Sequence, residues 1–100
     1  MTGRLRVVLT PQAFTDLTHI RDYLIERSPI GADNVRQAIN TTLDHLSDHP
    51  GLGRTRPELG LRSVGVPRYS YTIYYRIAET HIEIVHVRDD RRQPLAPGEL

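Results

Sequence analysis

Two pairs of residues, Thr10-Pro11 and Ser28-Pro29, place the strongest limits on how the first half of this chain can fold. In each pair a hydroxyl side chain can cap the helix that follows, and proline suits the first helical position, where its missing N–H would have no partner. Apolar side chains recur at helical spacing over residues 11–27 and again after Ser28. We therefore expect two consecutive helices joined by a tight turn, which makes them an antiparallel hairpin.

The second predicted helix ends where His49 is followed by Pro50, since proline disfavours helical conformation in the residue before it. A short strand, residues 4–9, precedes the first helix. The apolar side chains of the second helix share one face, as expected of a helix that packs on a core: Val35, Ala38, Ile39, Thr42, Leu43 and Leu46.

Three runs of strand character follow a turn-rich loop at residues 51–60. They cover residues 61–66, 69–77 and 81–87, and the short connections between them favour antiparallel neighbours. The expected fold is α+β with the order β-α-α-β-β-β, a helical hairpin packed on a four-stranded, mainly antiparallel sheet. Residues 1–100 are expected to form a single domain, with a loose tail from about residue 93.

The middle strand divides its side chains between two faces. Tyr71, Ile73 and Tyr75 alternate on one face, which we expect to pack against the helices, whereas Tyr74 and Arg76 are expected to point outward. The last strand does not alternate cleanly, and a bulge near Val85 or burial of both faces would explain this.

Arginine is concentrated in one part of the chain. All 13 basic residues are arginine, and residues 51–76 hold five of them against a single acid, Glu58, a local charge of +4. The planar guanidinium suits carboxylate and phosphate partners, although codons of a GC-rich genome would also favour arginine over lysine. We expect Arg54, Arg56, Arg62 and Arg76 to converge on the exposed sheet face beside Tyr74, as a docking surface or as a solvated face.

Several classes of site are excluded or disfavoured. The absence of cysteine excludes disulfides, thiolate zinc sites and a cysteine nucleophile. His45 and His49 have a spacing that could hold a metal, but no third ligand is evident, and histidine near a helix C-terminus is also favoured by the helix dipole. No phosphate loop or catalytic triad pattern is present, so no metal or other cofactor is expected. Without a membrane span or secretory segment, the predicted location is the cytoplasm.

Two segments of the chain carry a recognisable pattern, the run LGRTRPELGLRSVGVPRYSYTIYYRIAETHIEIVHVRDDRR and the upstream segment YLIERSPIGADN. In these segments the chain resembles the ParE branch of the ParE/RelE toxin superfamily, and the resemblance covers essentially the whole chain. Members of that branch read P-x-x-G-R-x-x-x-E-L, then G-x-R-S, then Y-x-I-x-Y-R, then I-E-I-x-x-V with a basic tail. The matching residues are Pro50, Gly53, Arg54, Glu58, Leu59, Gly60, Arg62, Ser63, Tyr71, Ile73, Tyr75, Arg76, Ile82, Glu83, Ile84 and Val87.

The resemblance implies a toxin of a type II toxin-antitoxin system that is neutralised by a cognate ParD-like antitoxin. ParE-like relatives are described as poisons of DNA gyrase, whereas RelE-like relatives cut mRNA on the ribosome. Thr72 stands where the mRNA-cutting relatives tend to carry arginine, and no tyrosine follows Tyr75. A gyrase poison is therefore the favoured hypothesis, and the chain is not expected to be an enzyme. A ribosome-dependent endonuclease and a non-toxic protein-binding module are the alternatives.

The resemblance also suggests roles for individual residues. An endonuclease would use Glu58 as a base and Arg62, Arg76 or Arg88 as a cation. The residues expected to contact the target are Arg62, Arg76, Arg88, Arg91 and Arg92, and those expected to contact the antitoxin are Arg54, Arg56 and Tyr74. A structural role for Arg62, in which it bridges the loop at Glu58 to the sheet, is the alternative.

Overall fold

A computed structural model describes residues 4–91 of the chain. Two helices follow a first strand, and a short 3-10 helix leads into four more strands. The elements are β1 (Arg6–Leu9), α1 (Pro11–Arg27), α2 (Pro29–Asp48), η1 (Pro50–Leu52), β2 (Arg54–Arg56), β3 (Leu61–Gly65), β4 (Tyr71–Ile77) and β5 (His81–Asp89). Within this described part, no helix is both long and apolar enough to cross a membrane. The predicted α+β class and the helical hairpin are confirmed.

The strands form one sheet in the order β1-β5-β4-β3-β2, in which β1 is parallel to β5 and all other pairs are antiparallel. The sheet has five strands rather than the four predicted, because residues 54–56 pair with β3 instead of forming a loop. Gly60, with a φ of 68°, lies in the turn that makes this pairing possible. A polar three-residue strand has no hydrophobic periodicity that a sequence pattern could reveal.

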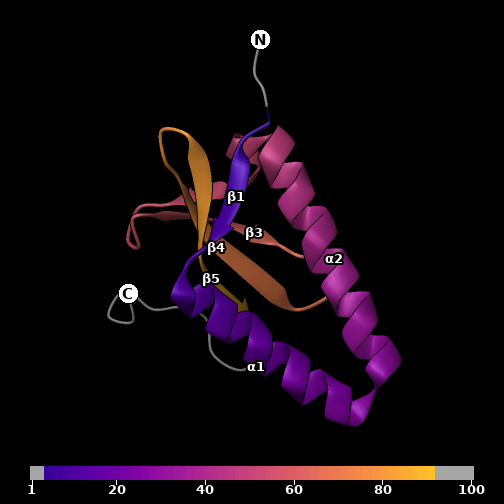
Figure 1. Cartoon of the computed structure of the whole chain (residues 1–100). Helices are drawn as coiled ribbons and strands as arrows, with labels where there is room; N and C mark the ends of the chain where they lie inside the picture. The colour runs from indigo at the N-terminus through magenta and orange to yellow at the C-terminus, as the bar shows by residue number, and fades with distance from the viewer. Residues whose placement is uncertain (1–3, 92–100) are drawn as a thin grey trace.

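Ser28 is the only residue between the two helices. Its N–H donates to the Leu24 carbonyl (2.7 Å) and so ends α1, while its hydroxyl accepts from the Gly31 N–H (3.0 Å) and so begins α2. The Thr10 hydroxyl caps α1 in the same way, at 3.2 Å from the Ala13 nitrogen. Figure 1 shows that α1 and α2 lie against the sheet and diverge from their junction.

The main core lies between the helices and one face of the sheet. Its largest fully buried side chains are Tyr75, Leu46, Ile73, Ile82 and Ile84, contributed by α2, β4 and β5. These side chains alternate along β4, as predicted for its helix-facing side. Burial of each such side chain contributes about 1.5–3 kcal/mol, so this layer holds the hairpin on the sheet.

A second, smaller cluster covers part of the opposite sheet face. Tyr74 packs there with Leu59, Leu61 and the half-buried Val85, and only 2% of Tyr74 is exposed. The prediction that Tyr74 presents its ring to solvent is therefore wrong. The turn that joins β2 to β3 brings Leu59 over the ring, a contact between distant segments that strand alternation alone cannot reveal.

The irregular pattern of β5 comes from a bulge, which was one of the two predicted explanations. Tyr74 pairs with His86 and Tyr75 with Ile84, so that Val85 is an extra residue in β5. The extra residue changes the phase of the strand, and Val87 joins Ile84 in the main core.

The edge of β5 beyond the end of β1 is covered by α1. The Thr10 hydroxyl donates to the Ile84 carbonyl (2.8 Å), and the Asp16 carboxylate accepts from the Val87 N–H (3.0 Å). The same carboxylate lies 3.2 Å from Nδ1 of the buried His86. Polar contacts therefore take the place of a sheet partner over this part of the strand.

The Tyr75 hydroxyl fixes the path of the chain between α2 and β2. It donates to the Pro50 carbonyl (2.8 Å) and accepts from the Gly53 N–H (2.8 Å). A Cβ atom at Gly53 would lie 2.7 Å from both this hydroxyl and the Ser63 carbonyl oxygen, so the close approach requires glycine. One side chain in the core thus holds η1 against the sheet.

We predict that Tyr75→Phe lowers the free energy of unfolding by about 1–3 kcal/mol, because the buried Gly53 N–H loses its partner. Urea denaturation followed by circular dichroism measures this change. Tyr69→Phe is the matched control: within residues 4–91 the Tyr69 hydroxyl has no hydrogen bond, and its loss should change stability by less than about 0.5 kcal/mol. Equal stabilities of the Tyr75→Phe variant and the parent chain would contradict this role.

Candidate functional site

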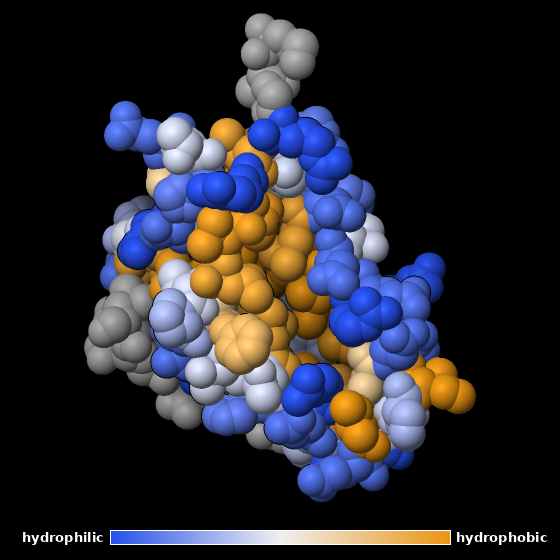
Figure 2. All heavy atoms as spheres, viewed as in Figure 1, coloured by the Kyte–Doolittle hydropathy of each residue, from blue (hydrophilic) through white to orange (hydrophobic). Residues whose placement is uncertain are grey.

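A mainly apolar groove lies between the two helices. It has a volume of about 490 Å³, and its walls come from α1 and α2, with Leu9 of β1 contributing at one end. Figure 2 shows a hydrophobic hollow bordered by hydrophilic residues in the opening between the helices. The apolar lining residues are Leu9, Phe14, Leu17, Ile20, Leu24, Ile25, Val35 and Ile39.

Several of these apolar side chains are exposed although they belong to the apolar stripe from which the first helix was predicted. Phe14 is 63% exposed and Ile25 46% exposed, while Leu17, Ile20 and Leu24 are half-buried. Contiguous exposed apolar surface bordered by polar residues marks a site of protein interaction. The diverging helices leave this part of α1 without a partner from the described chain.

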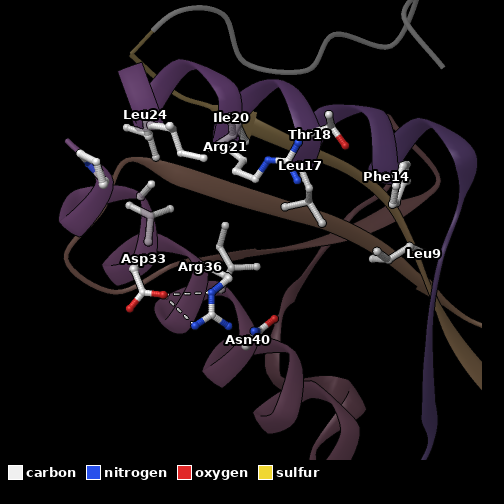
Figure 3. Close-up of a pocket in the computed structure, with 15 residues that line it drawn as sticks. Leu9, Phe14, Leu17, Thr18, Ile20, Arg21, Leu24, Asp33, Arg36 and Asn40 are labelled. Carbon is white, nitrogen blue, oxygen red and sulfur yellow. Dashed lines mark hydrogen bonds and ion pairs between the residues drawn. The ribbon is translucent and has the colours of Figure 1, made fainter. Parts of the chain in front are cut away.

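Charged residues lie at the border of the groove. Arg36 of α2 pairs with Asp33 one turn earlier (2.8 Å), and Arg21 of α1 pairs with its neighbour Asp22 (3.1 Å). Figure 3 shows Arg21 and Arg36 on different helices of the same groove. Both ion pairs are exposed and therefore weak, so each guanidinium can exchange its carboxylate for one on a bound partner.

The groove continues into the open edge of β1. Leu5, at the start of this edge, donates its N–H to the Ser47 carbonyl (3.0 Å) and accepts from the Ser47 hydroxyl (2.5 Å). Residues alternate in the direction of their backbone groups, so Val7 and Leu9 face the same way as Leu5. For these two residues the described part of the chain supplies no partner on that side, and the edge can accept an added strand.

The predicted arginines divide between the two faces of the sheet. Arg54 pairs in register with Ser63 and Arg76 with Glu83, which places both arginines on the face opposite the helices. Arg56 and Arg88 share that face. Arg54, Arg56 and Arg76 therefore lie on one face of the sheet, as predicted from the sequence.

Arg62 does not join this surface. It lies opposite Tyr75 on the helix-facing side and donates to the Gly53 carbonyl (2.8 Å). The prediction that Arg62 lies on the exposed face is wrong, because its position in β3 has the phase of Val64 rather than that of Ser63. Its partner is also not the loop at Glu58. Arg62 holds the segment that follows η1.

Glu58 is tied to the turn between β2 and β3. Its carboxylate accepts from Arg56 (3.0 Å). A hydrogen bond from its own backbone N–H, followed by the Arg56 guanidinium, lowers the pKa of the Glu58 carboxyl from its ordinary value. A carboxylate with a lowered pKa is a weak base, and the structure does not bring Glu58 and Arg62 together.

Two of the other arginines predicted to contact the target, Arg76 and Arg91, form ion pairs with acids. Arg76 pairs with Glu83, and this pairing, followed by His81, lowers the pKa of the Glu83 carboxyl. Arg91 pairs with Asp89 (3.1 Å), while Asp90 accepts from the Thr72 hydroxyl (2.6 Å). The remaining predicted residue, Arg92, lies outside the described residues.

Sequence reasoning did not identify the groove. The stripe that includes Leu17 and Leu24 has the same spacing whether it faces a core or a groove, so the pattern held no signal to distinguish them. His45 and His49 lie at the end of α2, and residues 4–91 contain no group of three potential metal ligands.

Comparisons with known proteins agree with this fold. The model of the family "ParE toxin of type II toxin-antitoxin system, parDE" matches residues 7–94. Toxin RelE2 of Caulobacter vibrioides is 36% identical over 87 residues, which cover 87% of this chain and 97% of that protein. Toxin RelE3 of the same organism is 31% identical over 84 residues, which cover 82% and 90%, respectively.

A solved structure described as the chromosomal ParDE TA system from P. aeruginosa has a similar fold. It superposes with a TM-score of 0.72 at 23% identity, covering 88% of this chain and 98% of that chain. The family match, which extends over most of the chain, carries the assignment. The chain belongs to the ParE toxin family of type II toxin-antitoxin systems.

Proposed function

We propose that this ParE-family toxin poisons DNA gyrase in the cytoplasm and is neutralised by a cognate ParD-like antitoxin. The observation that carries the antitoxin half of the proposal is the apolar groove of about 490 Å³ between α1 and α2. An amphipathic helix fits such a groove with apolar residues at helical spacing, and each buried side chain contributes about 1.5–3 kcal/mol.

The charged residues at the border of the groove support a particular chemistry for the antitoxin segment. Arg21 and Arg36 favour acidic residues on the flanks of the bound helix. The open edge at Val7 and Leu9 offers a place for an extended stretch that follows or precedes that helix. A segment of this kind is disordered when free, and it trades ordering entropy for a large interface. Arg54 and Arg56 remain candidates for further antitoxin contacts on the opposite sheet face.

We predict that Phe14→Ser and Ile25→Ser each weaken binding of the antitoxin encoded beside this chain by about 2 kcal/mol or more, roughly thirtyfold. Their exposed side chains should contribute little to folding of the toxin alone. Titration calorimetry with the C-terminal segment of the antitoxin measures the affinity. Ile30→Ser is the matched control, since Ile30 is 75% exposed on α2 but does not line the groove. Equal losses in all three variants, or none in the groove variants, would contradict the assignment.

The choice of gyrase as the target rests on the weakness of the alternative active site. Glu58, the acid available as a general base, has a lowered pKa and binds Arg56, whereas Arg62 faces the helices. Thr72 stands where mRNA-cutting relatives tend to carry arginine. The names of the two Caulobacter relatives favour the second candidate, a ribosome-dependent mRNA endonuclease.

Expression of the chain without its antitoxin separates the two mechanisms. We predict that it traps cleaved chromosomal DNA and induces an SOS response, both of which are measurable in the same culture. Primer extension on translated mRNA should reveal no codon-linked cuts. Codon-linked cuts together with intact chromosomal DNA would favour the endonuclease, and normal growth would favour a non-toxic binding module.

We predict that Glu58→Gln leaves growth inhibition intact, because a docking toxin needs no general base. A base-dependent endonuclease would lose about two to four powers of ten in rate. By contrast, alanine at Arg76, Arg88, Arg91 or Arg92 should weaken target binding by about 1–4 kcal/mol each. Survival curves at graded induction measure these effects, and circular dichroism verifies folding. Abolished toxicity of a folded Glu58→Gln variant, with Arg91→Ala and Arg92→Ala tolerated, would reverse the choice.

A further inference from the structure

A second concavity lies on the other flank of α2, against the turn between β3 and β4. Its volume is about 510 Å³, within the range of small-molecule sites. Unlike the mainly apolar groove between the helices, it presents polar and apolar surface in about equal parts. Asn34, Gln37, Thr41 and His45 contribute from α2, and Arg68 and Tyr69 from the turn.

Arg68 occupies an unfavourable backbone position. The Tyr69 N–H donates to the Val66 carbonyl (3.2 Å), which closes a turn with Pro67 in its second position and Arg68 in its third. Arg68 has a φ of 74°, and it is the only non-glycine residue with positive φ among residues 4–91. Glycine or asparagine suits this third position, so an arginine here raises the free energy of the turn. Such strain is characteristic of residues held for function.

No polar contact of the Arg68 side chain within residues 4–91 offsets this strain. It is exposed, and within residues 4–91 it makes no hydrogen bond or ion pair. No aspartate or glutamate lines the concavity, and the other titratable groups that line it are His45 and the Tyr69 phenol. The site therefore offers a guanidinium for an anion without an internal carboxylate to compete for it.

The neighbouring groups indicate which anion fits. Tyr69 is 37% exposed, so part of its ring is open to a planar group. Asn34 has a free side-chain amide, and Gln37 keeps its carbonyl oxygen available while its nitrogen donates to Asp33 (2.7 Å). A guanidinium binds phosphate, an aromatic ring stacks on a base, and amides hydrogen-bond to base edges.

We propose that this concavity binds a nucleotide, with its phosphate on Arg68 and its base against Tyr69. The nucleotide is either free or part of a single-stranded nucleic acid, since both present the same phosphate and base. The inference is independent of the proposed gyrase target and of the antitoxin groove, which lies on the other side of α2. Failure of one proposal leaves the other unaffected.

Fluorescence anisotropy of the full-length chain with a fluorescein-labelled ten-residue oligodeoxythymidylate at low salt tests the proposal. We expect saturable binding that Arg68→Gly weakens about ten- to a hundredfold. Glycine suits a φ of 74°, so this variant should melt at the same temperature or higher, and its loss of binding cannot be attributed to unfolding. Arg68→Asn is a second variant that tolerates the same backbone. Arg27→Ala is the matched control, because Arg27 is an exposed arginine on α1 that does not line the concavity.

Competition experiments identify the ligand chemistry. Displacement by adenosine monophosphate would indicate a free nucleotide, and displacement only by unlabelled oligonucleotide would indicate a nucleic-acid strand. Tyr69→Leu should weaken binding of either by several-fold, since the stacked ring is lost. The proposal would be overturned if no binding occurred or if Arg27→Ala weakened binding as much as Arg68→Gly. Equal displacement by inorganic phosphate or by polyglutamate would also overturn it, because the site would then lack selectivity for a nucleotide.

Discussion

Ser28 ends one helix and begins the next through two hydrogen bonds, and the shape of the molecule depends on this single residue. With no loop to absorb a change of direction, α1 and α2 meet at a fixed junction and diverge from it (Figure 1). The sheet can then bury the inner faces of both helices only in part. The stretch of α1 that contains Phe14 and Ile25 lines an open groove instead of packing on the sheet. The antitoxin proposal rests on this groove.

The sheet is held in place by polar contacts as much as by apolar packing. Asp16 accepts from the N–H of Val87 where β1 no longer covers β5, and the Tyr75 hydroxyl connects β4 to the segment after α2. Arg62 adds a third contact of this kind by donating to the Gly53 carbonyl. These groups lie on the helix-facing side, so the opposite face is free to present Arg54, Arg56 and Arg76. Structural and exposed arginines are thus separated by the alternation of the strands.

Much of the fold could be predicted from local patterns. The caps at Thr10 and Ser28, the stop at Pro50 and the bulge near Val85 each have a cause within a few residues of chain, and all four are present. The short strand β2 was missed because its pairing depends on a turn and a neighbour, not on its own composition. The face of Tyr74 was predicted correctly but its burial was not, since Leu59 covers it from another segment.

The sequence by itself determined both helices, four of the five strands, their order and the family, because capping, periodicity and motif spacing act over short stretches of chain. Only the tertiary structure decided which apolar stripe stays open, which arginines are exposed and which are structural. The apolar stripe on α1 has the same spacing whether it faces a core or a groove. Arg62 and Arg54 are the same residue type, so the sequence does not tell the structural arginine from the exposed one. Their environments differ because packing between distant segments, set by the angle of the hairpin and the register of the sheet, decides what each side chain meets.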